Sequence, residues 1–166
     1  ASSGPPARRC SGRIAPSAVV EVAGTRVGVV GATTERLPEI SSPRGVAVGE
    51  VLPAVQAEVD RLRADGVPVI ILFSHLQSIE EDLALAPLLR GVDVMIAGGG
   101  SELLANPDDP LLPGDAPSRP YPVIVRDADG RDLPIVTTSG DYRYAGRLIA
   151  GFDAEGRLVR VHEESG

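Results

Sequence analysis

The sequence predicts an α/β domain in which a parallel β-α-β-α-β unit is followed by antiparallel strands. Residues 67–73 (VPVIILF) and 92–97 (VDVMIA) are nearly continuous apolar runs, as expected for strands covered on both faces. Each run follows a segment with helical spacing of apolar residues, and this alternation predicts a parallel sheet with right-handed crossovers. Farther along the chain, residues 127–130 (DADG) and 153–156 (DAEG) are hairpin signals. The length of 166 residues fits one ordinary domain with a sizeable core.

The first half of the chain begins with two short strands and a helix. Residues 19–22 and 27–30 are apolar and are joined by a short turn, which predicts a hairpin. Residues 50–64 carry apolar side chains at helical spacing, with a proline in the first turn and Gly66 at the expected C-terminal cap.

The second helix is predicted to begin at Ser78. The Ser78 hydroxyl can accept a hydrogen bond from the amide of Glu81, whose carboxylate can reach back, which is the pattern of a capping box. Glu80, Glu81 and Asp82 would then lie at the positive end of the helix dipole. Pro87 is expected to end or kink this helix.

The last third of the chain has a different character. Residues 106–120 form a long proline-rich segment, and a loop of this length is either functional or mobile. Strand patterns follow at residues 123–126, 133–138, 143–152 and 157–162, and the sequence predicts that they form an antiparallel meander. Residues 1–16 are expected to be a disordered tail or the result of a truncation, and residues 17–166 to form the domain.

Composition excludes several classes of partner. The net charge of −7 argues against binding to nucleic acid or to an anionic membrane, because such proteins present a basic patch. No run approaches the ~20 apolar residues that span a bilayer, and no signal peptide is visible. The single cysteine, Cys10, excludes a disulfide framework and a cysteine-based zinc site.

The candidate site lies at the ends of the two buried strands. Ser74 and His75 follow the first strand, and Gly98 to Glu102 (GGGSE) follow the second. Ligands of open α/β sheets bind beyond the carboxyl ends of the strands, so these two clusters are predicted to be neighbours. A lone histidine after a strand is more often structural than metal-binding, and a glycine run is often only a tight turn. His162 is interpreted as a surface residue, and Asp108 and Asp109 as part of a solvent-exposed linker.

Several segments, taken in order, resemble the second half of the metallophosphatase domain of the 5'-nucleotidase family, within the calcineurin-like metallophosphoesterases. The resemblance runs through VEVAGTRVGVVGATT, IILFSHL, EEDLALA, GVDVMIAGG, YPVIVRDADG and TTSGDYRYAGRLIAGFDAEG. It implies a β-sandwich flanked by helices, of which this chain would supply the C-terminal half.

The resemblance also implies a two-metal phosphohydrolase. Two divalent ions (Mn²⁺, Zn²⁺ or Mg²⁺), ~3.5–4 Å apart, would hold a phosphate ester or nucleotide and supply a hydroxide for in-line attack. Three of the family's five ligand blocks lie before the matching region and would belong to a missing N-terminal half. The fourth block, a Ser-His or Thr-His, is matched by Ser74 and His75. The fifth reads Gly-Gly-His-Ser-His, and here Gly100 and Glu102 replace its two histidines.

His75 and Glu102 are therefore the predicted metal ligands. Glu102 could preserve one ligand, because carboxylates bind these ions, whereas Gly100 has no side chain to preserve the other. Three hypotheses remain: a segment of a divergent phosphohydrolase that is inactive as this chain alone, a non-catalytic relative that keeps the fold for binding or interaction, and a truncated product without independent function. Relatives in this family are mostly periplasmic, secreted or at the cell surface, so the resemblance suggests the same for this protein.

Overall fold

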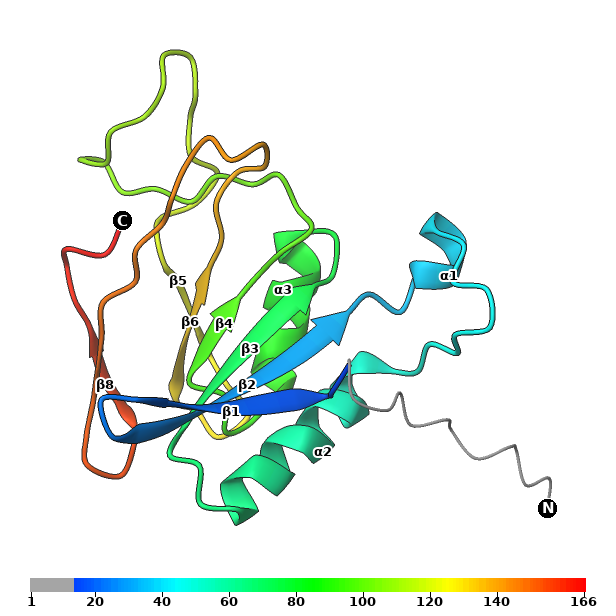
Figure 1. Cartoon of the computed structure of the whole chain (residues 1–166). Coiled ribbons are helices and arrows are strands. Elements are labelled where there is room, and N and C mark those ends of the chain that lie inside the picture. Colours follow the sequence, from blue (N-terminus) through cyan, green and yellow to red (C-terminus); the bar gives the residue numbers. More distant parts are fainter. Residues whose placement is uncertain (1–13) are drawn as a thin grey trace, which may run out of the picture.

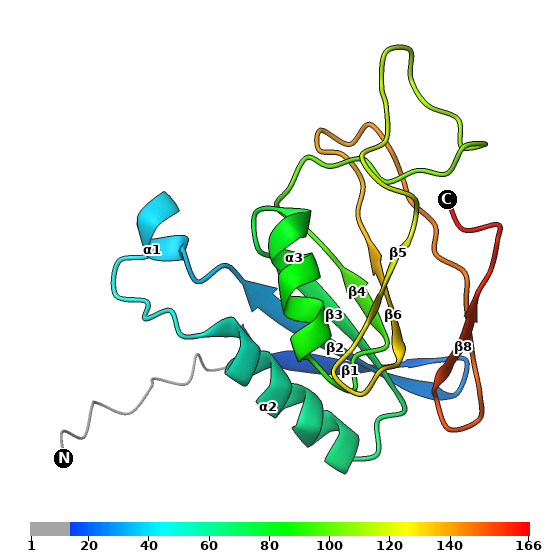
Figure 2. The same ribbon diagram turned by 180° about the vertical axis from the view of Figure 1, so that it is seen from behind.

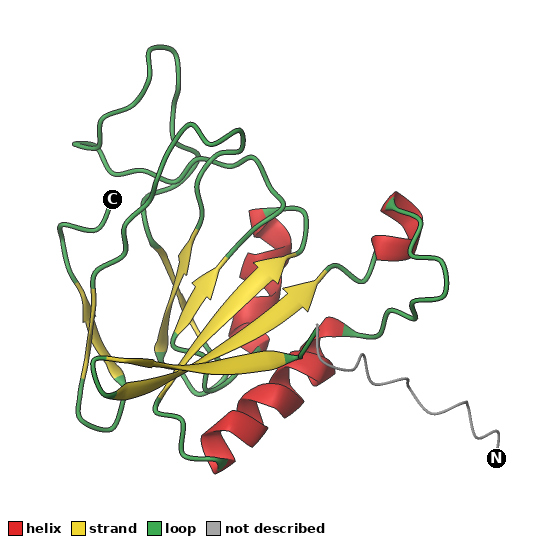
Figure 3. Ribbon diagram, in the orientation of Figure 1, coloured by secondary structure: helices red, strands yellow, loops and turns green. Residues whose placement is uncertain are grey.

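The computed structural model describes residues 14–166 and has a mixed α/β architecture (Figures 1 and 3). A six-stranded sheet has the order β1-β2-β3-β4-β6-β5, and β7 pairs with β8 in a second sheet. The strands are β1 (Ser17–Val22), β2 (Thr25–Thr33), β3 (Val69–His75), β4 (Val94–Ile96), β5 (Val123–Arg126), β6 (Asp132–Val136), β7 (Ala150–Phe152) and β8 (Leu158–Val161). The helices are α1 (Leu37–Ile40), α2 (Val51–Ala64), α3 (Ile79–Leu85) and the 3₁₀ turn η1 (Ala86–Leu88).

The predicted β-α-β-α-β unit is confirmed as β2-α2-β3-α3-β4. β2 runs parallel to β3, and β3 runs parallel to β4, with Ile71 paired with Val94. The predicted hairpin at the start is also confirmed, since β1 pairs antiparallel with β2. β3 begins two residues later than the apolar run because Pro68 has no amide hydrogen to donate to a strand.

One of the two hydrogen bonds of the predicted capping box is present at the start of α3. Ser78 is the N-cap, and its hydroxyl accepts a hydrogen bond from the Glu81 amide at 3.4 Å. The Glu81 carboxylate lies 3.8 Å from the Arg36 guanidinium. Pro87 falls in η1, where the α-helix gives way to a 3₁₀ turn as predicted.

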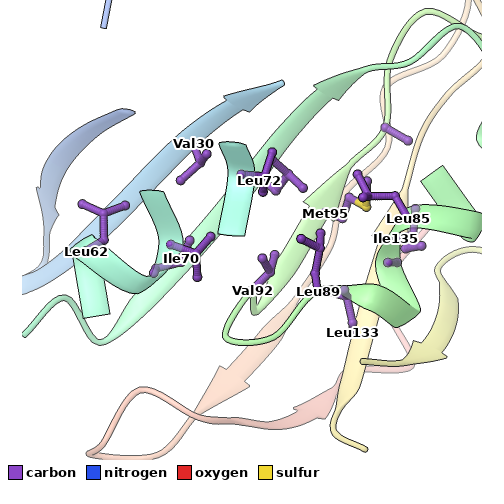
Figure 4. Close-up of a cluster of buried hydrophobic side chains, with 14 of the residues drawn as sticks. Val30, Leu62, Ile70, Leu72, Leu85, Leu89, Val92, Met95, Leu133 and Ile135 are labelled. Carbon is purple, nitrogen blue, oxygen red and sulfur yellow. The ribbon is translucent and has the colours of Figure 1, made fainter. Parts of the chain in front are cut away.

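Helices α2 and α3 cover one face of the six-stranded sheet (Figure 2). Because successive side chains of a strand point to opposite faces, alternate residues of the central strands meet these helices. Ile70 and Leu72 of β3 are fully buried there (Figure 4). The core is completed by Val30, Val55, Val59, Leu62, Leu85, Leu89, Met95, Leu133 and Ile135.

The opposite face of the sheet, which we call the open face, carries no helix in the described residues (Figure 1). It bears the other residues of β3, and Phe73 among them is 44% exposed. A groove of about 880 Å³ lies on this face between the sheet and the β7–β8 hairpin. Its lining is mainly apolar and includes Val20, Val27, Val29, Ile71, Leu148 and Phe152.

The C-terminal strands form the two predicted hairpins but not one continuous meander. β5 pairs antiparallel with β6, whereas β6 also enters the main sheet parallel to β4. β7 and β8 form a sheet of their own. The predicted strand at residues 143–152 is reduced to Ala150–Phe152, because the preceding segment binds the long loop instead: the Tyr144 hydroxyl accepts a hydrogen bond from the Leu112 amide at 2.8 Å.

A network around Arg63 and Asp93 joins α2 to the starts of β3 and β4. The Arg63 guanidinium donates to the Asp93 carboxylate (2.6 Å) and to the carbonyls of Pro68 (2.6 Å) and Gly91 (2.7 Å). The same Asp93 oxygen accepts from the Ile70 amide at 2.6 Å. Burial raises the pKa of Asp93, while the Ile70 amide and the Arg63 charge act in the opposite direction.

The predicted tail, residues 1–16, lies mostly outside the described residues, as does Cys10. Within residues 14–166, none of the helices combines the length and the apolar character needed to cross a bilayer.

We expect Asp93→Ala to lower the free energy of unfolding by about 2–3 kcal/mol, because it leaves the Ile70 amide without its acceptor and the half-buried guanidinium of Arg63 without its negative partner. Urea unfolding followed by circular dichroism measures this loss. Asp65→Ala is the control: Asp65 pairs with Arg61 at the end of the same helix, both side chains are about half exposed, and exposed pairs stabilise little. An equal loss in both variants would contradict the assigned role of Asp93.

Candidate functional site

The structure brings the two predicted clusters together at the carboxyl edge of the parallel sheet. His75 is the last residue of β3, and residues 98–102 follow the neighbouring strand β4. The carbonyl of His75 accepts a hydrogen bond from the Thr34 amide at 3.0 Å, which fixes the strand end against the segment after β2. The His75 side chain is exposed.

The imidazole of His75 packs against the glycine turn. A Cβ built on Gly99 would lie 3.0 Å from Cδ2 and 3.1 Å from Nε2 of His75. A Cβ built on Gly98 would lie 2.8 Å from the carbonyl oxygen of Ser74. Gly99 has a φ of +89°, a backbone conformation that side chains disfavour. Glycines at these two positions therefore let the turn after β4 approach the end of β3.

Glu102 lies against the next glycine of the same turn, Gly100. Its Oε1 accepts a long hydrogen bond of 3.4 Å from the amide of Ile79, the first residue of α3. Its carboxylate folds back over Gly100, with Cδ 3.0 Å from the position of a built Cβ. The two predicted metal ligands, His75 and Glu102, thus flank one three-glycine segment.

Asp82 adds a carboxyl group that the sequence pattern indicates only as a charge at the start of a helix. It is fully buried on α3, and its Oδ1 accepts a hydrogen bond from the Ser74 hydroxyl at 2.5 Å. Its Oδ2 is buried without a hydrogen-bond partner in the described structure. Burial raises the pKa of Asp82 to about 6; the Ser74 bond lowers it, while the carboxylates of Glu81 and Glu102 raise it.

A sequence signal for this buried carboxyl was present. Asp82 occupies the helical spacing of the buried residues Ile79 and Leu85, so a carboxylate stands on the face of the helix that packs against the core. Such a group is buried only when it finds a partner, and Ser74, at the end of the strand, provides one.

The remaining candidates lie elsewhere. Asp108 is exposed, as the linker interpretation predicts, whereas Asp109 is half-buried and its Oδ2 accepts from the Asn106 amide at 2.6 Å within the long loop. His162 follows β8 and is half-buried, with Nδ1 accepting from the Glu164 amide at 3.3 Å.

The described residues offer donors of the right chemistry for a divalent cation but not a complete site. Imidazole and carboxylate both bind Mn²⁺, Zn²⁺ or Mg²⁺ to different degrees. Within residues 14–166, however, no group of three or more histidine, cysteine, aspartate or glutamate side chains is arranged to hold an ion. His75 and Glu102 would need further ligands from outside this region.

No family model matches the chain, but comparison with known proteins finds similar sequences and structures. The chain is 34% identical over 157 residues to mouse 5'-nucleotidase, covering 94% of the chain and 27% of the mouse protein. It is 36% identical to a 5'-nucleotidase precursor from Thermus thermophilus, with a TM-score of 0.81 over 90% of the chain and 29% of that structure. The Haemophilus influenzae NAD nucleotidase shares the fold, with a TM-score of 0.77 at 23% identity.

These comparisons confirm the fold class and the resemblance inferred from the sequence. They also give its extent, because the chain spans only about a quarter of the length of the curated relatives it matches.

We expect Asp82→Asn to be less pH-dependent in stability than the parent chain. The folded pKa of about 6 lies above the ordinary value of 3.8, so the folded state binds more protons between these values, and this group's contribution falls as the pH rises from about 4 to 6. Asparagine keeps an acceptor for Ser74 without the charge. Melting curves from pH 4 to 8 should therefore show the variant gaining stability relative to the parent as the pH rises.

Glu80→Gln, on the exposed side of the same helix, is the matched control and should give a difference from the parent that changes little with pH. A constant offset between Asp82→Asn and the parent across this range would contradict the assignment.

Proposed function

Because this chain belongs, as a segment, to the 5'-nucleotidase family, we propose that it forms part of a divalent-metal-dependent phosphohydrolase acting on phosphate esters, with nucleotides among its substrates. The support is the similarity to 5'-nucleotidases along nearly the whole chain. In this proposal the chain is the C-terminal half of a metallophosphatase domain, and an N-terminal half completes it.

The observation that carries this proposal is that His75 belongs to the open face of the sheet. Val69, Ile71, Phe73 and His75 alternate along β3 on that face, while Ile70, Leu72 and Ser74 face the helices. Any chain segment that covers the exposed Phe73 also comes close to His75. One N-terminal half would thereby bury the apolar face and bring further ligands to the imidazole.

In the complete site, His75 and Glu102 would each contribute one ligand atom. The bound ions would polarise the phosphate ester and activate a water molecule for attack. The residues of this chain prepare that site: Gly98 and Gly99 hold the imidazole at the edge, and the Ser74–Asp82 hydrogen bond ties the end of β3 to α3. In this proposal, ligands from outside residues 14–166 complete the metal pair together with His75 and Glu102.

A second candidate function is a non-catalytic interaction module that keeps the same fold. It is favoured by Gly100, which stands where the family pattern has a ligand histidine, and by the lack of a three-ligand group within residues 14–166. The metal content of the longer protein that contains this chain decides between the two functions.

We expect His75→Ala to lower the metal content of that longer protein, because it removes an imidazole ligand. Mn²⁺ or Zn²⁺ bound per molecule, measured by inductively coupled plasma mass spectrometry, should fall by at least half, and Mn²⁺-dependent phosphate release should fall with it. The chain of 166 residues on its own should release no phosphate from a nucleoside monophosphate.

His162→Ala is the matched control, since it removes the only other histidine of the chain. Its metal content should equal that of the parent. Unchanged metal in His75→Ala would contradict the ligand role, and Mn²⁺-dependent phosphate release by the chain alone would contradict its dependence on an N-terminal half.

We also expect the chain alone to self-associate through the open face, because exposed apolar patches of this kind favour association. Phe73→Ser should shift sedimentation velocity profiles toward the monomer. Leu88→Ser is the control: Leu88 is 58% exposed, but it lies in η1 on the helix side of the molecule. If both variants associate like the parent, the open face is not the surface involved.

A further inference from the structure

The carboxylate of Glu102 occupies the space that a side chain at position 100 would use. A Cβ built on Gly100 would collide with Oε2 of Glu102, and the three nearest atoms to it all belong to the Glu102 carboxylate. The other two are Cδ at 3.0 Å and Oε1 at 3.3 Å. Gly100, unlike Gly99, does not have a positive φ. Glycine matters at position 100 because it has no side chain, not because of its backbone conformation.

The Glu102 carboxylate has a second carboxyl group near it and little hydrogen bonding to stabilise its negative charge. Burial is the main cause that raises the pKa of Asp82, and the negative charges of Glu81 and Glu102 act in the same direction. Asp82 also has an oxygen atom, Oδ2, that is fully buried and without a hydrogen-bond partner in the described structure. The long 3.4 Å bond from the Ile79 amide is the only hydrogen bond to the Glu102 carboxylate among residues 14–166. A cation near Glu102 would offset this concentration of negative charge.

We propose that Gly100 and Glu102 form one composite ligand position, in which the Glu102 carboxylate is presented to a divalent cation through the side-chain space of residue 100. This inference rests on the proposed metal-dependent function. The two differences from the family pattern, Gly100 and Glu102, are then coupled: the Glu102 carboxylate reaches this position only because residue 100 has no side chain. A carboxylate oxygen replaces an imidazole nitrogen there, which favours Mn²⁺ or Mg²⁺ relative to Zn²⁺.

The test is a double-mutant cycle in the longer protein that contains this chain, with Gly100→Ala, Glu102→Ala and the double variant. Alanine at position 100 displaces the carboxylate, so each single variant should weaken Mn²⁺ binding about tenfold in isothermal titration calorimetry. The double variant should lose no more than either single variant, because both remove the same ligand. The ratio of Mn²⁺ to Zn²⁺ affinity should fall in all three.

Melting temperatures give a second readout that does not need metal. Gly100→Ala should lower the melting temperature of the metal-free protein when Glu102 is present and should leave it unchanged in the Glu102→Ala background. Gly99→Ala is the control, since it strains the same turn at a positive φ without meeting Glu102, and its cost should be equal in both backgrounds.

The outcomes separate this inference from the proposed function. Additive effects of Gly100→Ala and Glu102→Ala on Mn²⁺ affinity or melting temperature would overturn the composite position while leaving metal binding in place. A parent protein that binds no Mn²⁺ would overturn the proposed function, and with it the ligand role of Glu102, even if the two positions remain coupled in stability.

Discussion

The relative placement of β3 and β4 depends on the Arg63–Asp93 pair and its hydrogen bonds. Arg63 reaches from α2 to carbonyls at the start of both strands, and Asp93 accepts from the Ile70 amide across them. A guanidinium offers several donors in a fixed plane, so one side chain can fix three chain segments together. Parallel strands that start in register also end in register, and this alignment brings His75 beside the glycine turn. The site at one edge of the sheet therefore depends on a network at the other.

The sequence correctly predicted the elements that depend on interactions between residues close together in the chain. The two buried strands, the Ser78 cap and the first hairpin follow from the apolar pattern, a short hydroxyl and a turn. The position of β6 in the sheet could not be predicted in this way, because the sequence of an apolar strand between turns does not indicate which strand it pairs with. The short β7 has a similar cause: Tyr144 and Arg143 bind the long loop, and the loop residue Asp115 pairs with Arg143 at 2.8 Å. Such long-range partners cannot be read from spacing along the chain.

The site was predicted in its position but not in its details. The rule that ligands bind at carboxyl strand ends correctly predicted that Ser74 and His75 lie beside the glycine turn after β4. The fold-back of Glu102 could not be foreseen, since it depends on empty space at Gly100 rather than on any property of glutamate. The burial of Asp82 could have been, because its helical position is that of the core residues beside it.

The two faces of β3 link folding of this chain to completion of its site. The side chains on the helix face are packed in the core, and Ser74, at the polar end of this face, donates a hydrogen bond to the buried Asp82. On the open face, Phe73 is 44% exposed, and His75 at the end of the strand is also exposed. Burial of apolar area is the main favourable term in folding, so a covering segment gains stability from the same surface that holds the imidazole. In the proposed metal-dependent function, metal binding would add to folding stability, because the ligands would come together only when that surface is covered.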